Sequence, residues 1–333
     1  MSETMRAVGS FDGLPVSDER SLVDVELPVP RLRSHDLLVR VQAVSVNPVD
    51  VKRRASLKPS VTPTVLGYDA AGVVEAIGPE VTTLGVGDEV FYAGDISRPG
   101  ANAELQAVDE RIVAERPGTL SFADAAALPL TSITSWESLF DRLRLTQQST
   151  GTLLILGAAG GVGSVMVQLA KLLTGLTVVG TASRGASRDW VAGLGADAVI
   201  DHHDLVNECG RAAPDGIDYV FSPHTAGNIE SFAEIMNPFG EIVAIDEPED
   251  LELLPLKTKS IAFHWELMFT RSLFETGMIE QKHLLARVAA LVDEGRIRGT
   301  VSERIGDFSA GGIRRAHALV ESGRMTGKVV VHR

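Results

Sequence analysis

Cysteine is almost absent from this 333-residue sequence, which contains a single one, Cys209. One thiol cannot form an intrachain disulfide, and it cannot build a zinc site made of several cysteines. The first residues, MSETMRAVGSFDG, also lack the basic and apolar regions of a signal peptide. We therefore expect a protein of a reducing compartment, the cytoplasm.

Positive charge is scarce as well. Lysine and arginine together number 31, against 44 aspartates and glutamates, which gives a formal net charge of −13 and a pI of about 5.1. Such a surface repels nucleic acid and anionic membranes, and the sequence contains no cluster of lysine and arginine long enough to bind either. We therefore expect neither a nucleic-acid partner nor a membrane partner.

Charge is missing altogether between residues 145 and 170, a stretch that a hydropathy window flags as a membrane span. Its apolar part, however, divides into a short β-type run, TLLIL, and a segment with helical spacing, VGSVMVQLAKLL. Several glycines lie where the two parts meet. A strand, a glycine turn and a helix therefore explain the stretch better than a membrane span does.

The glycine turn has the spacing G-x-x-G-x-x-G and lies inside a predicted βαβ unit. A strand ends at Leu156, a helix begins near Gly161, and a second strand spans residues 176–181. Such glycines let a pyrophosphate approach the backbone, and the free N–H groups at the helix N-terminus attract its charge. We predict a dinucleotide site, the alternative being a tight turn without a ligand. The candidate cofactor-binding residues are Gly157, Ala159, Gly160, Gly161, Val162 and Gly163.

The end of the second strand indicates which dinucleotide binds. Sites for NAD usually place an acidic residue about 20 positions after the glycines, where it binds the ribose 2′-hydroxyl. Here Ser183 and Arg184 occupy that place, and no acid follows before Asp189. A hydroxyl and a guanidinium suit a 2′-phosphate, so we predict NADP(H) as the cofactor. The alternative is that Arg184 is a solvated loop charge.

The length exceeds what one hydrophobic core usually organises, so we expect two domains. In residues 126–270, apolar strand segments alternate with helical ones, which predicts an α/β fold with a doubly wound parallel sheet. Residues 1–125 contain short β-rich runs between proline and glycine turns, typical of an antiparallel, barrel-like domain. Residues 271–333 hold two predicted helices and a strand, too little for a core of their own. We expect them to join the N-terminal domain.

Several segments occur in a characteristic order along the chain: SVNPVD, GYDAAGVVEAIG, GVGDEVF, DAAALPLTSITSWESL, GAAGGVG and TGKVVV. In this order the sequence resembles the medium-chain dehydrogenase/reductase superfamily. Within it, the chain is similar to the zinc-free quinone oxidoreductase branch, often labelled zinc-type alcohol dehydrogenase-like. The resemblance covers essentially the whole chain. It implies a GroES-like β-barrel catalytic domain of residues 1–125 with 271–333, a Rossmann NADP-binding domain over 126–270, and a homodimer.

Zinc-dependent relatives in this superfamily bind their catalytic metal through a cysteine, a histidine and a second cysteine. The resemblance places Asn47, Tyr68 and a position near Leu130 at these points, and such side chains cannot assemble a tetrahedral nitrogen and sulfur site. His202 and His203 are adjacent, and on a strand their side chains would point to opposite faces. We expect them to line the adenosine rim or to begin a helix, and we expect no metal at the catalytic position.

Without a metal, an acceptor that needs little activation is favoured. In a quinone or an α,β-unsaturated carbonyl, hydride adds to a conjugated carbon and the charge spreads to a distant oxygen, which hydrogen-bond donors can stabilise. We therefore predict an NADPH-dependent oxidoreductase that reduces such small electrophiles by hydride transfer. Two alternatives stay open: a zinc-independent alcohol or aldehyde oxidoreductase, and a low-turnover NADPH-binding protein that acts as a sensor or partner.

The remaining candidate residues lie outside the glycine turn. Asn47 and Tyr68 are predicted to donate hydrogen bonds to the substrate, or in the case of Asn47 to the cofactor ribose; the alternatives are a loop-stabilising asparagine and a packing tyrosine. Thr131 is predicted to lie near the nicotinamide, or alternatively to cap the following helix. Ser222 follows the fourth strand, where a Rossmann sheet faces its cofactor. Lys328 is expected from the resemblance to be a cation near the cofactor, the alternative being a solvated charge.

Overall fold

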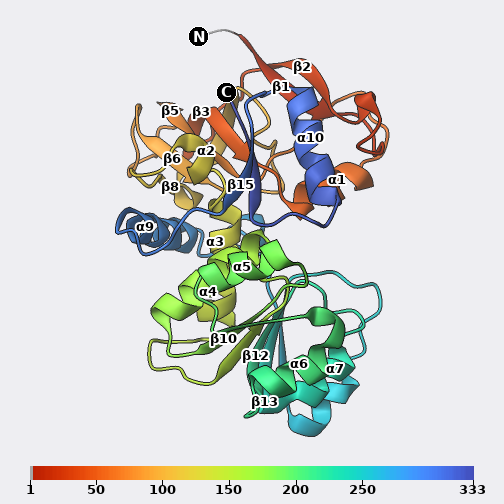
Figure 1. The fold of residues 1–333 in the computed structure, drawn as a ribbon. Coiled ribbons are helices and arrows are strands. Elements are labelled where there is room, and N and C mark those ends of the chain that lie inside the picture. The colour runs from red at the N-terminus through yellow and green to blue at the C-terminus, as the bar shows by residue number, and fades with distance from the viewer. Residues whose placement is uncertain (1–2) are drawn as a thin grey trace. The chain divides into compact units, whose positions relative to one another are not determined.

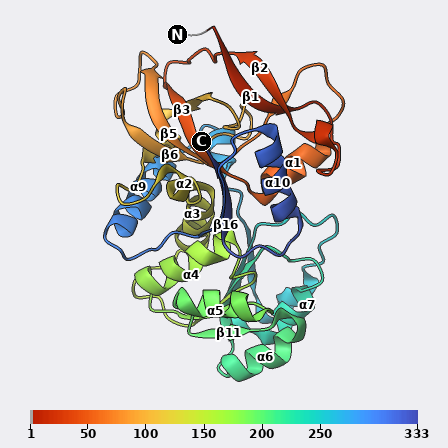
Figure 2. The same ribbon diagram turned by 45° about the horizontal axis from the view of Figure 1, so that its top comes forward.

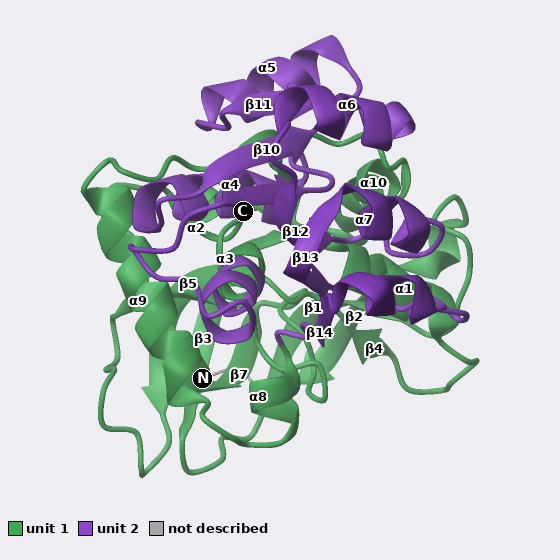
Figure 3. Cartoon of the chain, turned by 90° about the horizontal axis from the view of Figure 1, so that it is seen from below, with its two compact units in different colours: residues 1–133, 269–333 green, residues 134–268 purple. Residues whose placement is uncertain are grey.

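The computed structural model describes residues 3–333, and the chain divides into two compact units (Figures 1 and 3). Unit 1 comprises residues 1–133 and 269–333, and unit 2 comprises residues 134–268. The sequence placed the two boundaries at 125/126 and 270/271. The two compact units divide instead at 133/134, within the helix α3 (Pro129–Trp136), and at 268/269.

Unit 2 is built on a six-stranded sheet in which every neighbouring pair of strands is parallel. The strands lie in the order β11-β10-β9-β12-β13-β14. This is the order of a doubly wound Rossmann sheet, so the predicted α/β fold class is confirmed. The strand bounds are β9 Thr152–Ile155, β10 Thr177–Thr181, β11 Ala198–Ile200, β12 Ile217–Ser222, β13 Met236–Ala244 and β14 Ala262–Trp265.

The central strands of this sheet are apolar because a parallel sheet is covered on both faces. Leu154, Val220 and Ile242 are fully buried and share one core with Phe232. Figure 1 shows α4 beside α5 and α6 beside α7. The helical segments of unit 2 are η3 (Glu137–Arg142), α4 (Gly161–Leu173), α5 (Gly185–Gly193), η4 (His202–Asp204), α6 (Leu205–Ala212), α7 (Ile229–Ile235) and η5 (Leu254–Lys259).

The uncharged stretch between residues 145 and 170 forms β9, a glycine turn and most of α4, as predicted. The helix is 13 residues long and begins at Gly161. Within residues 3–333, no helix has both the length and the apolar character that a bilayer crossing requires.

Unit 1 is mainly antiparallel. Its larger sheet has the order β15-β16-β3-β5-β6-β8, with β7 also paired to β3, and a smaller sheet has the order β2-β1-β4. The pair β15 and β16 is parallel, which the sequence did not indicate. Because β16 pairs with β3, the C-terminal segment completes the sheet of the N-terminal segment. The strand bounds are β1 Thr4–Ser10, β2 Val23–Pro28, β3 Asp36–Ser45, β4 Thr64–Val65, β5 Ala70–Ile77, β6 Glu89–Tyr92, β7 Leu105–Asp109, β8 Ala114–Glu115, β15 Val301–Ile305 and β16 Lys328–His332.

The helices of unit 1 include two that the sequence predicted, at residues 279–295 and 308–322, and others that it did not. The first turn of α1 has a proline at its start and Asn47 as its N-cap, which explains why a helix begins there. The helix bounds are η1 Glu19–Ser21, α1 Pro48–Ser56, η2 Glu110–Ile112, α2 Phe122–Ala125, α8 Thr270–Leu273, α9 Ile279–Asp293 and α10 Ala310–Glu321, with α3 beginning in this unit.

A buried histidine lies on α10, which packs against α1 (Figure 2). His317 is fully buried, and within residues 3–333 neither of its ring nitrogens has a hydrogen-bond partner. Burial, assisted by the positive charge of Arg54, lowers the pKa of His317 from 6.5 to about 3. The imidazole is therefore neutral in the folded protein at neutral pH.

We predict that His317 makes the folded protein sensitive to acid. The unfolded chain takes up a proton on this residue near pH 6.5, whereas the folded chain does so only near pH 3, so the free energy of unfolding falls as the pH is lowered through this window. The loss is at most about 1.4 kcal/mol per pH unit. Urea unfolding at several pH values should show a flatter dependence for His317→Leu than for the wild type.

The exposed His283 supplies the control for this experiment, since its side chain is 64% exposed. His283→Gln should leave the pH dependence of the wild type unchanged. Identical pH dependence in the wild type and His317→Leu would contradict the assignment.

Candidate active site

The three glycines of the turn after β9 differ in what their surroundings require. Gly157 has a φ of 64°, in the left-handed region that favours glycine, and it turns the chain sharply. A Cβ at Gly163 would lie 2.5 Å from the Cα of Ala158, so this glycine lets α4 pack closely on the turn. A Cβ at Gly160 would meet the carbonyl oxygen of Gly157, at 3.3 Å. The backbone thus favours glycine at 157 and 163, whereas a Cβ at Gly160 would meet only one atom, at 3.3 Å.

The N-terminus of α4 is suited to an anion. Gly160 is the N-cap, and as a glycine it has no side chain to cap this helix. The N–H groups of the first turn therefore lack helical partners. The turn follows β9, which lies beside β12 where the strand order reverses, and doubly wound folds bind nucleotides at this point. A pyrophosphate on the turn, which also contains Ala159, Gly161 and Val162, stays our prediction.

Ser183 and Arg184 lie in the exposed segment between β10 and α5. The nearby Arg188 has a structural role, because its guanidinium donates hydrogen bonds to the carbonyl oxygens of Ala182 at 3.2 Å and Val199 at 2.6 Å. It thereby ties the ends of β10 and β11 together. The side chain of Arg184 is solvent-facing, and its contact with a 2′-phosphate stays a prediction.

Ser222 is buried at the carboxyl end of β12. Its hydroxyl accepts a hydrogen bond from the backbone N–H of His224 at 3.1 Å, and its carbonyl oxygen accepts one from Ile245 at 3.1 Å. These bonds hold the loop that follows the strand. The predicted backbone contact with the cofactor stays a prediction.

Asn47, Asp69 and Lys328 form one buried polar cluster in unit 1, and none is more than 4% exposed. The Lys328 ammonium donates to Asn47 Oδ1 and, at 3.1 Å, to Asp69 Oδ2. Asn47 Nδ2 donates to the same Asp69 oxygen at 2.9 Å. Burial raises the pKa of Asp69, and the Lys328 ammonium works against this increase. The alternative that Lys328 is a solvated charge is therefore wrong, and its contact with the cofactor stays a prediction.

Asp69, in this cluster, and Asp50, beside it, hold backbone segments in place. Asp69 Oδ1 accepts a hydrogen bond from the N–H of Leu130 at 2.8 Å, at the start of α3. Asp50 accepts from the N–H of Asn47 at 2.8 Å and from that of Gly67 at 3.0 Å. Burial raises the pKa of Asp50 to about 7. Asn47 thus has the loop-stabilising role that we gave as its alternative, and its contact with a substrate stays a prediction.

Tyr68 is 1% exposed and packs edge-on against Phe269, with the ring centroids 5.5 Å apart. The Arg53 guanidinium lies 5.7 Å from the Tyr68 ring centroid. Burial raises the pKa of Tyr68 to about 12, although the charge of Arg53 acts in the opposite direction. The phenol is therefore protonated at neutral pH and is able to donate a hydrogen bond. Its donation to a substrate stays a prediction.

Thr131 lies inside α3 rather than at its start. Its hydroxyl donates to the carbonyl oxygens of Leu128 at 3.0 Å and Ala127 at 3.3 Å. The alternative that it caps the helix is therefore wrong. Its predicted position near the nicotinamide stays a prediction.

Two charged members of this region, Asp69 and Arg53, were not among the predicted site residues. Asp69 directly follows Tyr68, one of the positions that the resemblance singled out, so the sequence could have identified it as a neighbour of that position. Arg53 offers no such signal, because its contact with Tyr68 depends on how α1 is placed in the fold.

The positions at which zinc-dependent relatives bind their metal do not suit zinc in this chain. Asn47 supplies an amide, Tyr68 a neutral phenol, and Leu130 no side-chain donor. In addition, the Lys328 ammonium is hydrogen-bonded to Asn47 and paired with Asp69, so a cation is already part of the cluster. These residues do not fit the metal, and we assign no step to it.

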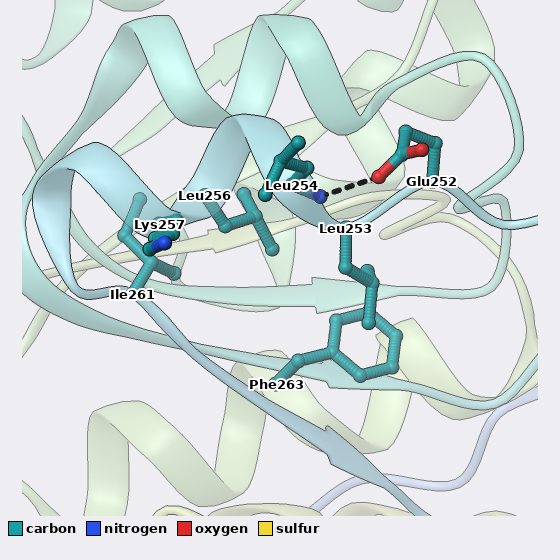
Figure 4. A pocket seen from close by; sticks show the side chains of 7 residues that line it. All are labelled: Glu252, Leu253, Leu254, Leu256, Lys257, Ile261 and Phe263. Carbon is teal, nitrogen blue, oxygen red and sulfur yellow. Dashed lines mark hydrogen bonds between the residues drawn. The ribbon is translucent and has the colours of Figure 1, made fainter.

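A separate hollow on unit 2 lies beside η5 and β14 (Figure 4). It is lined by Leu253, Leu254, Leu256, Ile261 and Phe263, together with Glu252 and Lys257. None of the residues predicted for the site lies there, so this hollow is not part of the candidate active site.

Comparisons with known proteins match most of the chain. An alcohol dehydrogenase GroES-like domain matches residues 33–129, and a zinc-binding dehydrogenase domain matches residues 194–331. A zinc-type alcohol dehydrogenase-like protein of Staphylococcus aureus is 40% identical over 91% of this chain and 92% of its own length. The chloroplastic NADPH-dependent alkenal/one oxidoreductase of Arabidopsis thaliana is 31% identical over 93% of this chain and 75% of its own length.

Among solved structures, a Rhizobium etli protein named as a candidate zinc-dependent alcohol dehydrogenase superposes with a TM-score of 0.95. It is 48% identical, and the match covers 100% of this chain and 99% of that one.

We predict that substitutions at Gly160 and Gly163 have different consequences. Gly160→Val should abolish NADPH binding in a fluorescence titration, because the side chain would stand where the pyrophosphate approaches the helix end. Gly163→Ala should lower the free energy of unfolding by about 1–3 kcal/mol, because its Cβ would lie within 2.6 Å of two backbone atoms. If Gly160→Val binds NADPH as the wild type does, the turn is not the pyrophosphate site.

Proposed function

Because this chain belongs to the medium-chain dehydrogenase/reductase superfamily, in its quinone oxidoreductase-like branch, we propose that it reduces quinones or α,β-unsaturated carbonyls with NADPH and without a metal. The observation that carries this proposal is the cluster of Asn47, Asp69 and Lys328 with Tyr68, which stands in place of a zinc site. An enzyme without a Lewis acid is best suited to an acceptor that stabilises its own developing charge. Conjugated carbonyls have this property.

The cofactor part of the proposal rests on unit 2. When bound, NADPH supplies the hydride. The backbone N–H groups of Gly161 and Val162 bind the pyrophosphate, which the positive end of the helix favours. Ser183 and Arg184 bind the 2′-phosphate, since both are exposed at the strand end where NAD-specific sites hold an acid. The Arabidopsis relative, whose name includes NADPH, supports the same cofactor.

The part of the proposal that concerns the hydride acceptor depends on Tyr68. Because burial raises the pKa of Tyr68 to about 12, the phenol keeps its proton and acts as a hydrogen-bond donor to the acceptor oxygen. The Arg53 guanidinium, 5.7 Å from the ring centroid, adds positive potential as negative charge develops on that oxygen. In a conjugated acceptor this oxygen lies away from the carbon that receives the hydride. Solvent then supplies the last proton, so no side chain needs to act as a strong acid.

The proposal is tested by following NADPH oxidation with a quinone, an enone and a simple aldehyde. We expect turnover with the quinone or the enone, little turnover with the aldehyde, and a lower dissociation constant for NADPH than for NADH. Turnover with the aldehyde alone would favour an alcohol or aldehyde oxidoreductase. No turnover with any of them, despite tight NADPH binding, would favour a sensor or partner protein.

Replacing Tyr68 by phenylalanine should separate hydrogen-bond donation from packing. We predict that Tyr68→Phe lowers kcat by about 100-fold, as the loss of one oxyanion donor typically does, while the dissociation constant for NADPH is unchanged. Tyr92 provides a matched control, because it is also buried in unit 1 and within residues 3–333 its hydroxyl has no hydrogen-bond partner. Tyr92→Phe should leave kcat unchanged. A similar loss in both variants, or in neither, would contradict the role of Tyr68.

A further inference from the structure

Asp201, His202 and His203 form a group of possible metal ligands on the surface of unit 2. We expected the two histidines to diverge, as adjacent residues of a strand do. That premise is wrong, because β11 ends at Ile200 and the histidines lie in the short helical turn η4, at the start of α6. The expectation that they begin a helix is therefore correct, and their geometry has to be considered again.

In this turn the three side chains converge. The ring centroids of His202 and His203 are 4.1 Å apart, with 31° between the ring planes. Asp201 Oδ1 lies 2.6 Å from His203 Nδ1 and 3.8 Å from His202 Nδ1. One ligand atom from each residue lies within 4.8 Å of the other two, and among the described residues no other group of histidine, cysteine and acidic side chains meets this criterion.

The backbone holds the carboxylate in this position. Asp201 caps η4, and its Oδ1 accepts a hydrogen bond from the N–H of His203 at 3.0 Å. Because this bond fixes the carboxylate directly beside both imidazoles, an ion that replaces the hydrogen bond between His203 Nδ1 and Asp201 Oδ1 can reach all three donors.

We propose that Asp201, His202 and His203 bind a divalent transition metal ion of the kind that imidazole favours, such as Zn²⁺, Ni²⁺ or Cu²⁺. Two imidazoles with one carboxylate suit these ions, whereas Mg²⁺ and Ca²⁺ prefer sites made of oxygen ligands alone. The side chains of His202 and His203 are 50% and 70% exposed, so water completes the coordination. The ion is therefore exchangeable and not a structural or catalytic centre.

This site is separate from the positions that correspond to the zinc ligands of relatives, and it changes how a metal analysis has to be interpreted. Asn47, Tyr68 and Leu130, which correspond to the zinc ligands of relatives, belong to unit 1, whereas Asp201, His202 and His203 belong to unit 2. Zinc found in the purified protein would therefore not by itself indicate a catalytic metal.

The test uses the full-length, untagged protein after treatment with a chelator. Calorimetric titration with Zn²⁺ should show one site per chain in the wild type. His202→Asn combined with His203→Asn should weaken that site by about tenfold or more, as the loss of ligands requires. His283→Asn is the matched control, because His283 is exposed and lies 3.5 Å from Glu280, and it should leave the affinity unchanged.

A second measurement identifies the ligands directly. Electron paramagnetic resonance of the Cu²⁺-loaded protein should show coupling to two nitrogen nuclei in the wild type and to one in each single histidine variant. Because both imidazoles are exposed, the variants should unfold at the temperature of the wild type. Zn²⁺ affinity that is unchanged in the double variant, or lost equally in His283→Asn, would overturn the proposal. So would a Cu²⁺ spectrum that is identical in all variants.

Discussion

The buried ion pair between Lys328 and Asp69 is the interaction on which unit 1 depends. Lys328 begins β16, and Asp69 immediately precedes β5. Asn47, the N-cap of α1, contacts both of them, and Asp69 also binds the backbone at the start of α3. A buried charge that loses its partner costs about 3–5 kcal/mol, so these segments cannot shift independently. The position of Tyr68, next to Asp69 in the chain, depends on the same pair.

The chemistry of this cluster also shows that belonging to a family named for zinc does not imply a mechanism that uses zinc. The chain belongs to a family whose names and domain descriptions include zinc. In this chain, however, an ammonium group bound to an amide and a carboxylate occupies the region where relatives place thiolate and imidazole ligands. A lysine supplies positive charge without an open coordination position, so it cannot polarise a substrate oxygen as zinc does. This difference is what favours a conjugated acceptor.

Unit 2 could be predicted well from the sequence, because the patterns that specify it lie close together along the chain. Apolar strands, the glycine spacing and the helix after it are all read within about 30 residues, and strand order then follows from the rules for parallel sheets. The cluster in unit 1 was harder to predict. The hydrogen bond between Lys328 and Asn47 joins residues 281 positions apart, and no periodicity or spacing signals such a contact.

The position of the histidine pair was also mispredicted, because the end of a strand is hard to place from sequence. The prediction treated residues 202 and 203 as strand residues, whereas the strand stops two residues before His202, at Ile200.

The pairing of β16 with β3 has a consequence for how the protein is made. Residues 36–45 and Asp69 leave the ribosome early, but Lys328 follows every residue of unit 2. The carboxylate that is buried in the finished protein therefore remains without its counter-ion during the synthesis of unit 2. Because domains generally fold as units during synthesis, unit 2 has all of its strands before unit 1 does. The N-terminal segment of unit 1 can therefore complete its sheet only when β16 has been made, after all of unit 2.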